Sequence, residues 1–303
     1  MPLSQWLLLV FLSLLWGGSF LFNGIAVQEL PLLSIVMARV GLGALLLTTA
    51  VYAMGLQLPR GWAAWQPFMV MALCNNILPF ILIVRGQQEI ASGLASILYA
   101  TTPLFAVIGA HLFLADEKAD ARKLAGVVIG ICGVAILVGP EVLFGASSSL
   151  FGMMCMLGAA ICYAIAGLWA RRFKAIPLPV AAAGPLICAT VVLLPFALLI
   201  DRPWTLPMPS AATLWSLAGL AALSTALGYI VFFRLVAVSG AINSMLVTLL
   251  VPVSAITFGA LFLGETLLPR HFAGAAIIGA ALLLLDGRML KLLKRLSPQP
   301  ADQ

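Results

Sequence analysis

Residues 103–118 read PLFAVIGAHLFLADEK, and residues 252–266 read PVSAITFGALFLGET. Each stretch begins with a proline, continues as an apolar segment and reaches a glutamate soon after its last leucine. The prolines lie 149 positions apart, and Glu117 falls on Glu265 after a slip of one residue. Because prolines, charges and segment ends coincide, the chain contains an internal repeat of about half its length.

Apolar runs of similar length occur along the whole chain. A helix needs about 20 apolar residues to cross a bilayer, so the runs predict ten transmembrane helices. Helices are expected because an open strand edge cannot face lipid. The runs are residues 6–22, 32–54, 67–84, 91–114, 124–139, 149–170, 178–200, 211–233, 241–264 and 271–286.

The composition supports a membrane protein. Hydrophobic residues make up 63% of the 303 residues and charged residues only 9%, whereas a soluble domain carries roughly 25% charged residues. The net charge of +6 does not indicate nucleic-acid binding, because the cations are spread over short loops. The cysteines lie in apolar runs without a CxxC pair, so no disulfide, metal site or cofactor is predicted. They are Cys74, Cys132, Cys155, Cys162 and Cys188.

The repeat predicts how the halves are oriented. We expect residues 1–140 and 141–287 to form one five-helix repeat each, followed by a basic amphipathic cytoplasmic tail at 288–303. Five spans are an odd number, so the two halves enter the membrane from opposite sides. The fold class is therefore an all-α membrane protein of two inverted repeats, an arrangement common among secondary transporters.

The positions of lysine and arginine predict the topology. With the first span retained and the N-terminus inside, twelve cations face the cytoplasm and three face outward. This bias places both termini in the cytoplasm and the protein in the inner membrane of a bacterial-type cell. The inner cations are Arg60, Lys118, Arg122, Lys123, Arg171, Arg172, Lys174, Arg234, Arg288, Lys291, Lys294 and Arg295; the outer ones are Arg85, Arg202 and Arg270.

The segments quoted above, together with LWGGSF at residues 15–20, resemble a known family. They are similar to the EamA-type transporters of the drug/metabolite transporter superfamily, and the resemblance covers roughly residues 5–287. It implies ten helices, alternating access and export of small metabolites, without identifying the substrate. Tyr163 stands about where the second repeat of that family often carries tryptophan.

Polar residues occur at matching places in the two halves. Asn75 and Asn76 precede Pro79, and a shift of 149 places them on Ser224 and Thr225, which precede Gly228. Transporter sites lie near the midplane where matching spans are interrupted. We therefore expect a polar cavity between spans one, three, four, six, eight and nine, although packing between helices remains the alternative for single Ser and Thr residues.

The expected contacts with a solute combine amides, hydroxyls and aromatic rings. Trp169 could line the cavity or, beside Arg171 and Arg172, anchor the membrane interface. The substrate-binding candidates are Trp16, Arg39, Asn75, Asn76, Tyr99, Thr102, Tyr163, Thr225, Tyr229 and Asn243. The candidate hinges are Pro79, Pro103, Gly228 and Pro252, because proline leaves a carbonyl without its amide partner.

Arg39 is the one charge well inside an apolar run, seven residues past Leu32. It could neutralise a substrate carboxylate or hold the carbonyls of a partner helix. Alternatively, its long side chain could reach the outer surface. Both interpretations remain open from the sequence.

The sequence places Asp and Glu at or beyond the ends of the runs, so energy coupling is not predicted. We expect an exporter of small amino-acid-like metabolites, with a small-molecule solute and membrane lipid as partners and a homodimer left open. The alternative within transport is a translocase of a lipid-linked or nucleotide-linked sugar. A membrane-embedded enzyme is disfavoured because no nucleophile and base can be paired, and a scaffold without transport remains a lesser alternative.

Overall fold

The computed structural model describes residues 2–113, 120–138, 148–173, 175–239 and 247–286. Within these ranges the regular structure is entirely helical, with no strand. The α-helices are α1 (Leu3–Ala26), α2 (Leu32–Ala53), α3 (Trp62–Ala72), α4 (Leu78–Gln87), α5 (Ser92–Tyr99), α6 (Thr102–Phe113), α7 (Ala121–Val138), α8 (Ser148–Trp169), α9 (Leu178–Phe196), α10 (Ala211–Ala218), α11 (Gly228–Ser239), α13 (Val247–Leu263) and α14 (Pro269–Asp286).

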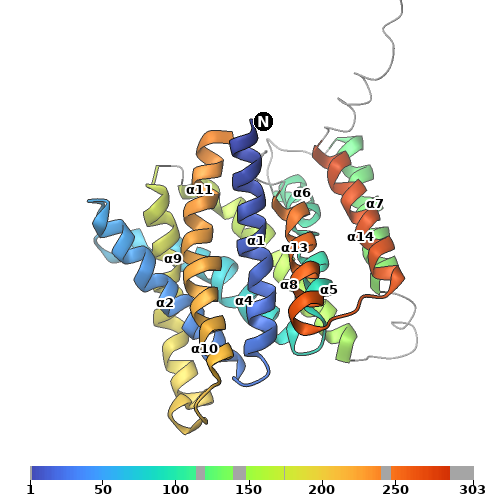
Figure 1. The fold of residues 1–303 in the computed structure, drawn as a ribbon. Coiled ribbons are helices and arrows are strands. Elements are labelled where there is room, and N and C mark those ends of the chain that lie inside the picture. The colour runs from blue at the N-terminus through green and yellow to red at the C-terminus, as the bar shows by residue number, and fades with distance from the viewer. Residues whose placement is uncertain (1, 114–119, 139–147, 174, 240–246, 287–303) are drawn as a thin grey trace, which may run out of the picture.

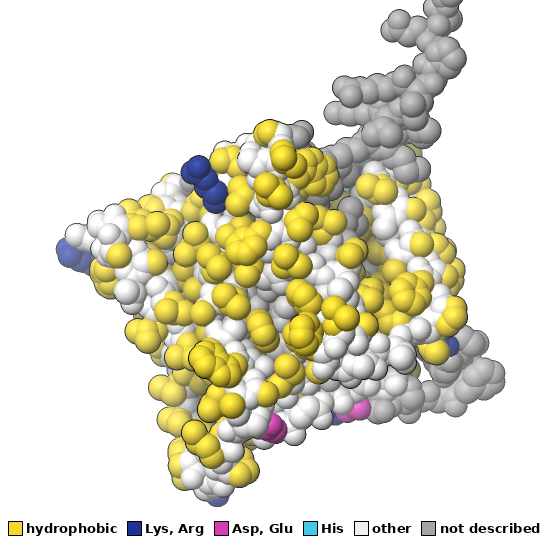
Figure 2. All heavy atoms as spheres, in the orientation of Figure 1, with side chains coloured by type: hydrophobic (Ala, Val, Ile, Leu, Met, Phe, Trp, Pro, Cys, Tyr) yellow, Lys and Arg dark blue, Asp and Glu magenta, His cyan; other side chains and the backbone are white. Residues whose placement is uncertain are grey.

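Seven helical stretches among the described residues are long and apolar enough to cross a membrane. Two shorter apolar helices, Leu250–Leu263 and Pro269–Leu284, follow them. Figure 2 shows hydrophobic side chains over the middle of the visible face, with charged side chains toward its edges. A lipid-facing surface explains exposed side chains such as Leu199 and Trp215. The chain is thus a multi-pass helical membrane protein.

Close contacts at glycine join the first half of the chain to the second. A Cβ added to Gly17 of α1 would lie 2.5 Å from Cβ of Ser254 in α13, and Ser13 is hydrogen-bonded to the same serine at 3.1 Å. Likewise, a Cβ at Gly43 of α2 would lie 3.6 Å from Leu186 of α9. Small residues at these contacts let the helices approach closely.

A second pair of helices stands at the side of the bundle. Figure 1 shows α7 and α14 next to each other, apart from α1. Gly133 lies against Ile278, and Gly274 lies against Leu137. The residue numbers rise on one helix as they fall on the other, so α7 and α14 are antiparallel.

Three helices contain π-helical turns, in which backbone hydrogen bonds span five residues. The segment η1 (Leu73–Ile77) separates α3 from α4, η4 (Ala197–Asp201) ends α9, and η6 (Gly219–Leu227) separates α10 from α11. The first and third contain the polar pairs of the repeat. The sequence therefore predicted where the third and eighth spans are interrupted, but not that the helix widens there.

The candidate hinges differ in whether the helix is interrupted beside them. The fourth span is broken at residues 100–101, between α5 and α6, immediately before Pro103. Pro79 lies at the start of α4, and Gly228 opens α11 after η6. In contrast, α13 continues through Pro252. A role of Pro252 as a hinge therefore has no helix break beside it in the described part of that span and stays a prediction.

Carboxylates join the two halves at the end of the bundle opposite the N-terminus. Each accepts a hydrogen bond from a backbone N–H at the N-terminal end of a helix in the other half, where N–H groups lack intrahelical partners. The pairs are Glu29 with Ser210 (2.7 Å), Asp201 with Ser34 (2.6 Å) and Glu265 with Ser92 (2.7 Å). Glu265 also accepts a hydrogen bond from the backbone N–H of Gly93 at 3.1 Å, so it caps the N-terminal end of α5.

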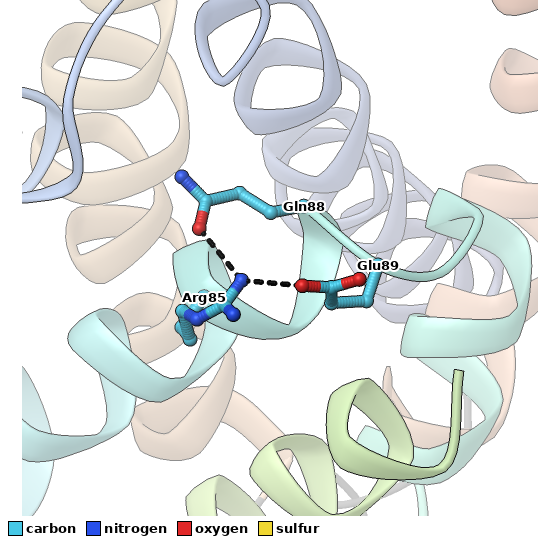
Figure 3. A network of polar contacts seen from close by, with 3 residues as sticks. All are labelled: Arg85, Gln88 and Glu89. Carbon is cyan, nitrogen blue, oxygen red and sulfur yellow. Dashed lines mark hydrogen bonds and ion pairs between the residues drawn. The ribbon is translucent and has the colours of Figure 1, made fainter. Parts of the chain in front are cut away.

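An ion pair lies at the same end, where α4 ends. Nη1 of Arg85 is 2.7 Å from a carboxylate oxygen of Glu89 and 3.0 Å from the side-chain oxygen of Gln88 (Figure 3). The guanidinium also lies over the ring of Phe151 in α8, 5.0 Å from its centroid. Arg85 therefore connects this turn to α8.

The other sequence expectations have mixed outcomes. The third span begins at Trp62, earlier than expected, and includes Pro67. Cys132 is exposed. Lys118, Glu117 and the tail at 288–303 lie outside the described residues.

Candidate functional site

A cavity of about 620 Å³ lies between the helices. Eight of the ten residues expected to bind solute line it, on α1, α2, η1, α5, α8, η6 and α11. They are Trp16, Arg39, Asn75, Asn76, Tyr99, Tyr163, Thr225 and Tyr229. Residues from both halves of the sequence therefore meet at one site, as the matching interruptions predicted.

The cavity opens toward one end of the bundle. Its lining reaches Arg171, the exposed Leu178 and the partly buried Val236, which lie near the ends of their helical segments. In the other direction the lining stops at Phe20 and Ile83, both of which are buried. The structure is therefore open on the side of Arg171 and closed on the side of Glu265.

Arg39 is the charged group at the inner part of the cavity. Its residue is only 8% exposed, its Nε donates a hydrogen bond to Oγ1 of Thr225 at 3.1 Å, and its Cζ lies 3.8 Å from the ring centroid of Phe80. Thr225 in turn donates to the carbonyl of Leu220 at 2.8 Å. Arg39 is thus held inside the protein by η6 and α4, and of the two interpretations left open by the sequence, these contacts do not fit a side chain extended to the membrane surface.

The remaining hydrogen-bonding capacity of Arg39 faces the cavity. Among the described residues, neither terminal nitrogen of its guanidinium has a hydrogen bond or ion pair. The lining likewise includes no Asp or Glu within the ranges that the structure describes. A planar guanidinium with free donors can bind a carboxylate through two parallel hydrogen bonds.

The two asparagines of η1 point at the same partner. Nδ2 of Asn75 donates to the hydroxyl of Tyr229 at 3.0 Å, and Nδ2 of Asn76 approaches the same hydroxyl at 3.4 Å. Neighbouring residues on a regular α-helix do not face the same partner, yet here both amides do. The π-helical turn brings both toward α11. Oδ1 of Asn76 has no partner among the described residues.

Aromatic rings form much of the wall. Tyr99 meets Tyr163 edge-on at a centroid distance of 5.5 Å and lies 5.9 Å from Phe20. On another wall, Trp16 lies 5.4 Å from Phe232. Tilted and edge-on rings present both π faces and polar edges, so the site combines apolar surface with a few polar groups. This lining is typical of a small-molecule site.

Two of the expected site residues are not in the lining. The hydroxyl of Thr102 donates to the carbonyl of Tyr99 at 2.7 Å, which satisfies the carbonyl next to the break in the fourth span. Asn243 lies outside the described residues. Trp169 is also absent from the lining: its Nε1 donates to the carbonyl of Pro67 at 3.0 Å, and Arg172 lies over its ring.

Sequence reasoning missed part of the wall. Span seven, which was not expected to take part, contributes Pro185, and span two, also absent from the expected spans, carries the expected residue Arg39. The ninth span, expected to take part, supplies no described lining residue. Phe80, which supports Arg39, follows Pro79 directly, and Phe232 lies one turn after Gly228. Aromatic residues within one turn after a helix breaker were the available signal. Within the described ranges no group of three His, Cys, Asp or Glu residues could hold a metal ion.

Comparison with known proteins agrees with this architecture. The model of the EamA-like transporter family matches residues 4–139 and matches again at residues 150–285. The chain belongs to the EamA-like transporter family. It is therefore a membrane transporter whose helices are apolar enough to span a membrane.

Relatives in this family extend over most of the chain. The chain is 28% identical to "Uncharacterized transporter YoaV" of Bacillus subtilis (strain 168), over 89% of this chain and 92% of that protein. It is 30% identical to "Probable amino-acid metabolite efflux pump" of Salmonella typhimurium, over 63% of this chain and 66% of that protein. A solved crystal structure aligns with a TM-score of 0.66 at 16% identity, over 98% of this chain and 100% of its own, which shows a shared fold.

Proposed function

We propose that this EamA-family transporter exports small amino-acid-like metabolites by alternating access. The observation that carries the proposal is Arg39, a buried guanidinium whose terminal nitrogens face a cavity without described carboxylates. A carboxylate of the solute would supply the missing acceptor. The apolar part of the solute would lie on Trp16, Tyr99 or Tyr229.

The charge of the cavity favours neutral or zwitterionic cargo. An unpaired cation in a dry site is costly, and Arg39 would repel a quaternary ammonium drug. Amides and hydroxyls at Asn75 and Tyr229 offer hydrogen bonds to polar groups of the solute. The relative named as an amino-acid metabolite efflux pump supports the same class of solute.

The helix packing supports alternating access between inverted halves. We propose ten spans, divided near residue 140, with both termini in the cytoplasm of a cell whose inner membrane holds the protein. In this arrangement α1 lies along α13, and α8 lies along α5 and α6, so each half places its first span beside the fourth span of the other. The π-helical turns η1 and η6 occupy matching positions in the two halves. Two equivalent halves can exchange conformations, which switches the open side.

Phosphate-bearing cargo remains the second candidate. Arg171 is another cation in the lining, at the open end of the cavity, and a lipid-linked or nucleotide-linked sugar could bridge Arg39 and Arg171. Cargo of this kind would need both cations, whereas an amino acid needs only Arg39.

Purified protein in liposomes tests the proposal with labelled amino acids, a nucleotide sugar and a quaternary ammonium drug. We expect transport of amino acids. We further expect that Arg39→Ala lowers the rate at least tenfold, and that Arg39→Lys restores little because lysine cannot form the paired hydrogen bonds. Arg60→Ala, at an exposed arginine outside the cavity, is the matched control. The proposal would be overturned if the protein transports the drug but no amino acid. It would also be overturned if Arg39→Ala, at equal abundance, transports at the wild-type rate.

A further inference from the structure

Two buried amides lie just beyond the closed end of the cavity. Asn23 is 1% exposed, and neither its Nδ2 nor its Oδ1 has a partner among the described residues. Gln87 is 6% exposed, and its Oε1 also lacks a partner there. A buried polar atom without a hydrogen bond destabilises the state that contains it. These atoms therefore indicate a role in another conformation.

Both amides continue the faces that line the cavity. Asn23 is one helical turn past Ser19 and Phe20 on α1, and Gln87 is one turn past Ile83 on α4. Residues three or four apart share a helix face, and one turn advances about 5.4 Å along the axis. Because the lining stops at Phe20 and Ile83, Asn23 and Gln87 occupy the next position along the same path.

The orientation of Gln87 is fixed by its neighbours. Its Nε2 donates to the carbonyl of Phe20 at 2.8 Å and approaches Oγ of Ser92 at 3.0 Å. Ser92 Oγ donates to the same carbonyl at 3.1 Å, and its backbone N–H is bound by Glu265. The nitrogen of the Gln87 amide is thus used for structure, which leaves its oxygen available as an acceptor.

An aromatic pair separates the amides from the open cavity. Phe20 is 3% exposed and lies 5.9 Å from Tyr99, ring centroid to ring centroid. The carbonyl of Phe20 is the atom to which Gln87 and Ser92 are bonded. A movement of α1 away from α4 and α5 would therefore displace this ring and break the contacts of Gln87 together.

We propose that Asn23 and Gln87 form a second solute-binding station, on the far side of Phe20, which is used when the cavity opens toward the end that carries Glu265. This inference rests on the proposed alternating access. The oxygens of Asn23 and Gln87 would accept hydrogen bonds from the ammonium or amide group of an amino-acid-like solute, and Nδ2 of Asn23 would donate to its carboxylate. A site for a bare cation would use oxygens alone, whereas here a donor is also unpaired.

Cysteine labelling tests whether the station becomes accessible. Single cysteines replace Asn23 or Gln87 in a background without the five native cysteines, and a membrane-impermeant maleimide is applied to each membrane face. We expect Asn23→Cys and Gln87→Cys to react at least tenfold faster from the face of Glu29 than from the face of Arg171. Ser13→Cys is the matched control, since Ser13 is buried on the same helix but faces Ser254.

Labelling at the rate of the Ser13→Cys control, or labelling only from the face of Arg171, would overturn the inference. The measurement requires no knowledge of the solute. If the wild-type protein transports no amino acid, the proposed function is disproved, but the labelling rates can still be interpreted.

Transport by Asn23→Leu gives a second measurement. Leucine is of similar size and removes a buried amide without partners, so we expect thermal stability to be unchanged or raised. We expect binding of solute from the open side to stay within twofold, while the transport rate falls about tenfold. A wild-type rate would contradict the inference. So would a sodium requirement that the variant abolishes, because the amides would then serve a cation.

Discussion

Tyr229 shows how one side chain organises a wall of the cavity. Its hydroxyl receives the amides of Asn75 and Asn76, and its ring faces the space beside Arg39. These contacts cross from the first half of the sequence to the second. The hydroxyl is therefore expected to hold the two amides in the orientation in which a solute meets them.

Replacing Tyr229 with phenylalanine removes that acceptor while keeping the ring. A typical hydrogen bond contributes about 0.5–1.5 kcal/mol, so we expect the KM for transported solute to rise about two- to tenfold. The measurement is concentration-dependent uptake into liposomes. Tyr52→Phe is the matched control, because Tyr52 is exposed near the end of α2. An unchanged KM for Tyr229→Phe would show that the amides need no such support.

At the scale of elements, the LWGGSF segment of α1 is explained by its contact with α13. A Cβ on Gly17 would lie 2.5 Å from Cβ of Ser254 and 3.0 Å from the backbone nitrogen of Ala255. The neighbouring Gly18 differs, since a Cβ there would meet only side-chain atoms at 3.7 Å or more. The close approach of α1 to α13 thus requires one glycine of the two.

Alanine at Gly17 is therefore expected to destabilise the protein. Overpacking a tight contact costs about 1–3 kcal/mol, and here the opposing atoms include backbone. We expect a lower Tm in detergent for Gly17→Ala, measured by thermal unfolding with tryptophan fluorescence. Gly18→Ala serves as the adjacent control and should unfold near the wild-type temperature. Equal Tm values for the two variants would contradict the packing argument.

The link between Glu29 and α10 should depend on pH. Hydrogen bonds from the side chain and backbone of Ser210 lower the pKa of the exposed Glu29 carboxyl from its ordinary value of 4.5. A lowered pKa means that the contact is present above 4.5 and is lost as the pH falls through the pKa of the folded state.

Hydrogen–deuterium exchange can follow this contact. After correction for intrinsic rates, we expect the amide of Ser210 to be protected at neutral pH and to lose protection below pH 4.5. Glu29→Gln should remove most of that pH dependence. Gln28→Glu changes the charge of the same exposed turn by one unit without touching the Glu29 contact. It therefore controls for a general effect of charge. Protection of Ser210 that ignores both pH and the Glu29→Gln substitution would rule out this link.

For the whole molecule, the distribution of cations and the open side of the cavity make a joint prediction. The cavity opens beside Arg171, on the end that the positive-inside rule assigns to the cytoplasm. An exporter in this conformation would take up its solute from the cell interior.

Reporter fusions test this orientation directly. We expect fusions at Arg60, Arg172 and Arg295 to report a cytoplasmic position and a fusion at Arg202 to report an external one. Two sites on the same side of the membrane must be separated by an even number of spans, and two sites on opposite sides by an odd number. The four fusions therefore also test the ten-span topology. A fusion at Arg295 that reports outside would exclude two five-span halves.

The sequence by itself determined the class of the protein and the places where its helices are interrupted. Apolar runs of span length leave little choice but helices, since backbone polar groups in lipid must be satisfied within a segment. The repeat aligned Asn75 and Asn76 with Ser224 and Thr225, and the structure contains π-helical turns at both places. Apolar runs, and polar residues followed by a helix breaker, are properties of short segments. They can therefore be predicted from the sequence.

The tertiary structure decided which side chains share a space. Whether Arg39 reaches the surface or the interior depends on Thr225 and Phe80, which lie 186 and 41 residues away in the sequence. The contact of Glu265 with α5 and the burial of the Asn23 and Gln87 amides likewise depend on residues far away in the sequence. Every face of a membrane helix can be apolar, so periodicity does not separate the face toward lipid from the face toward a partner helix. Only the packing of one half against the other makes that distinction.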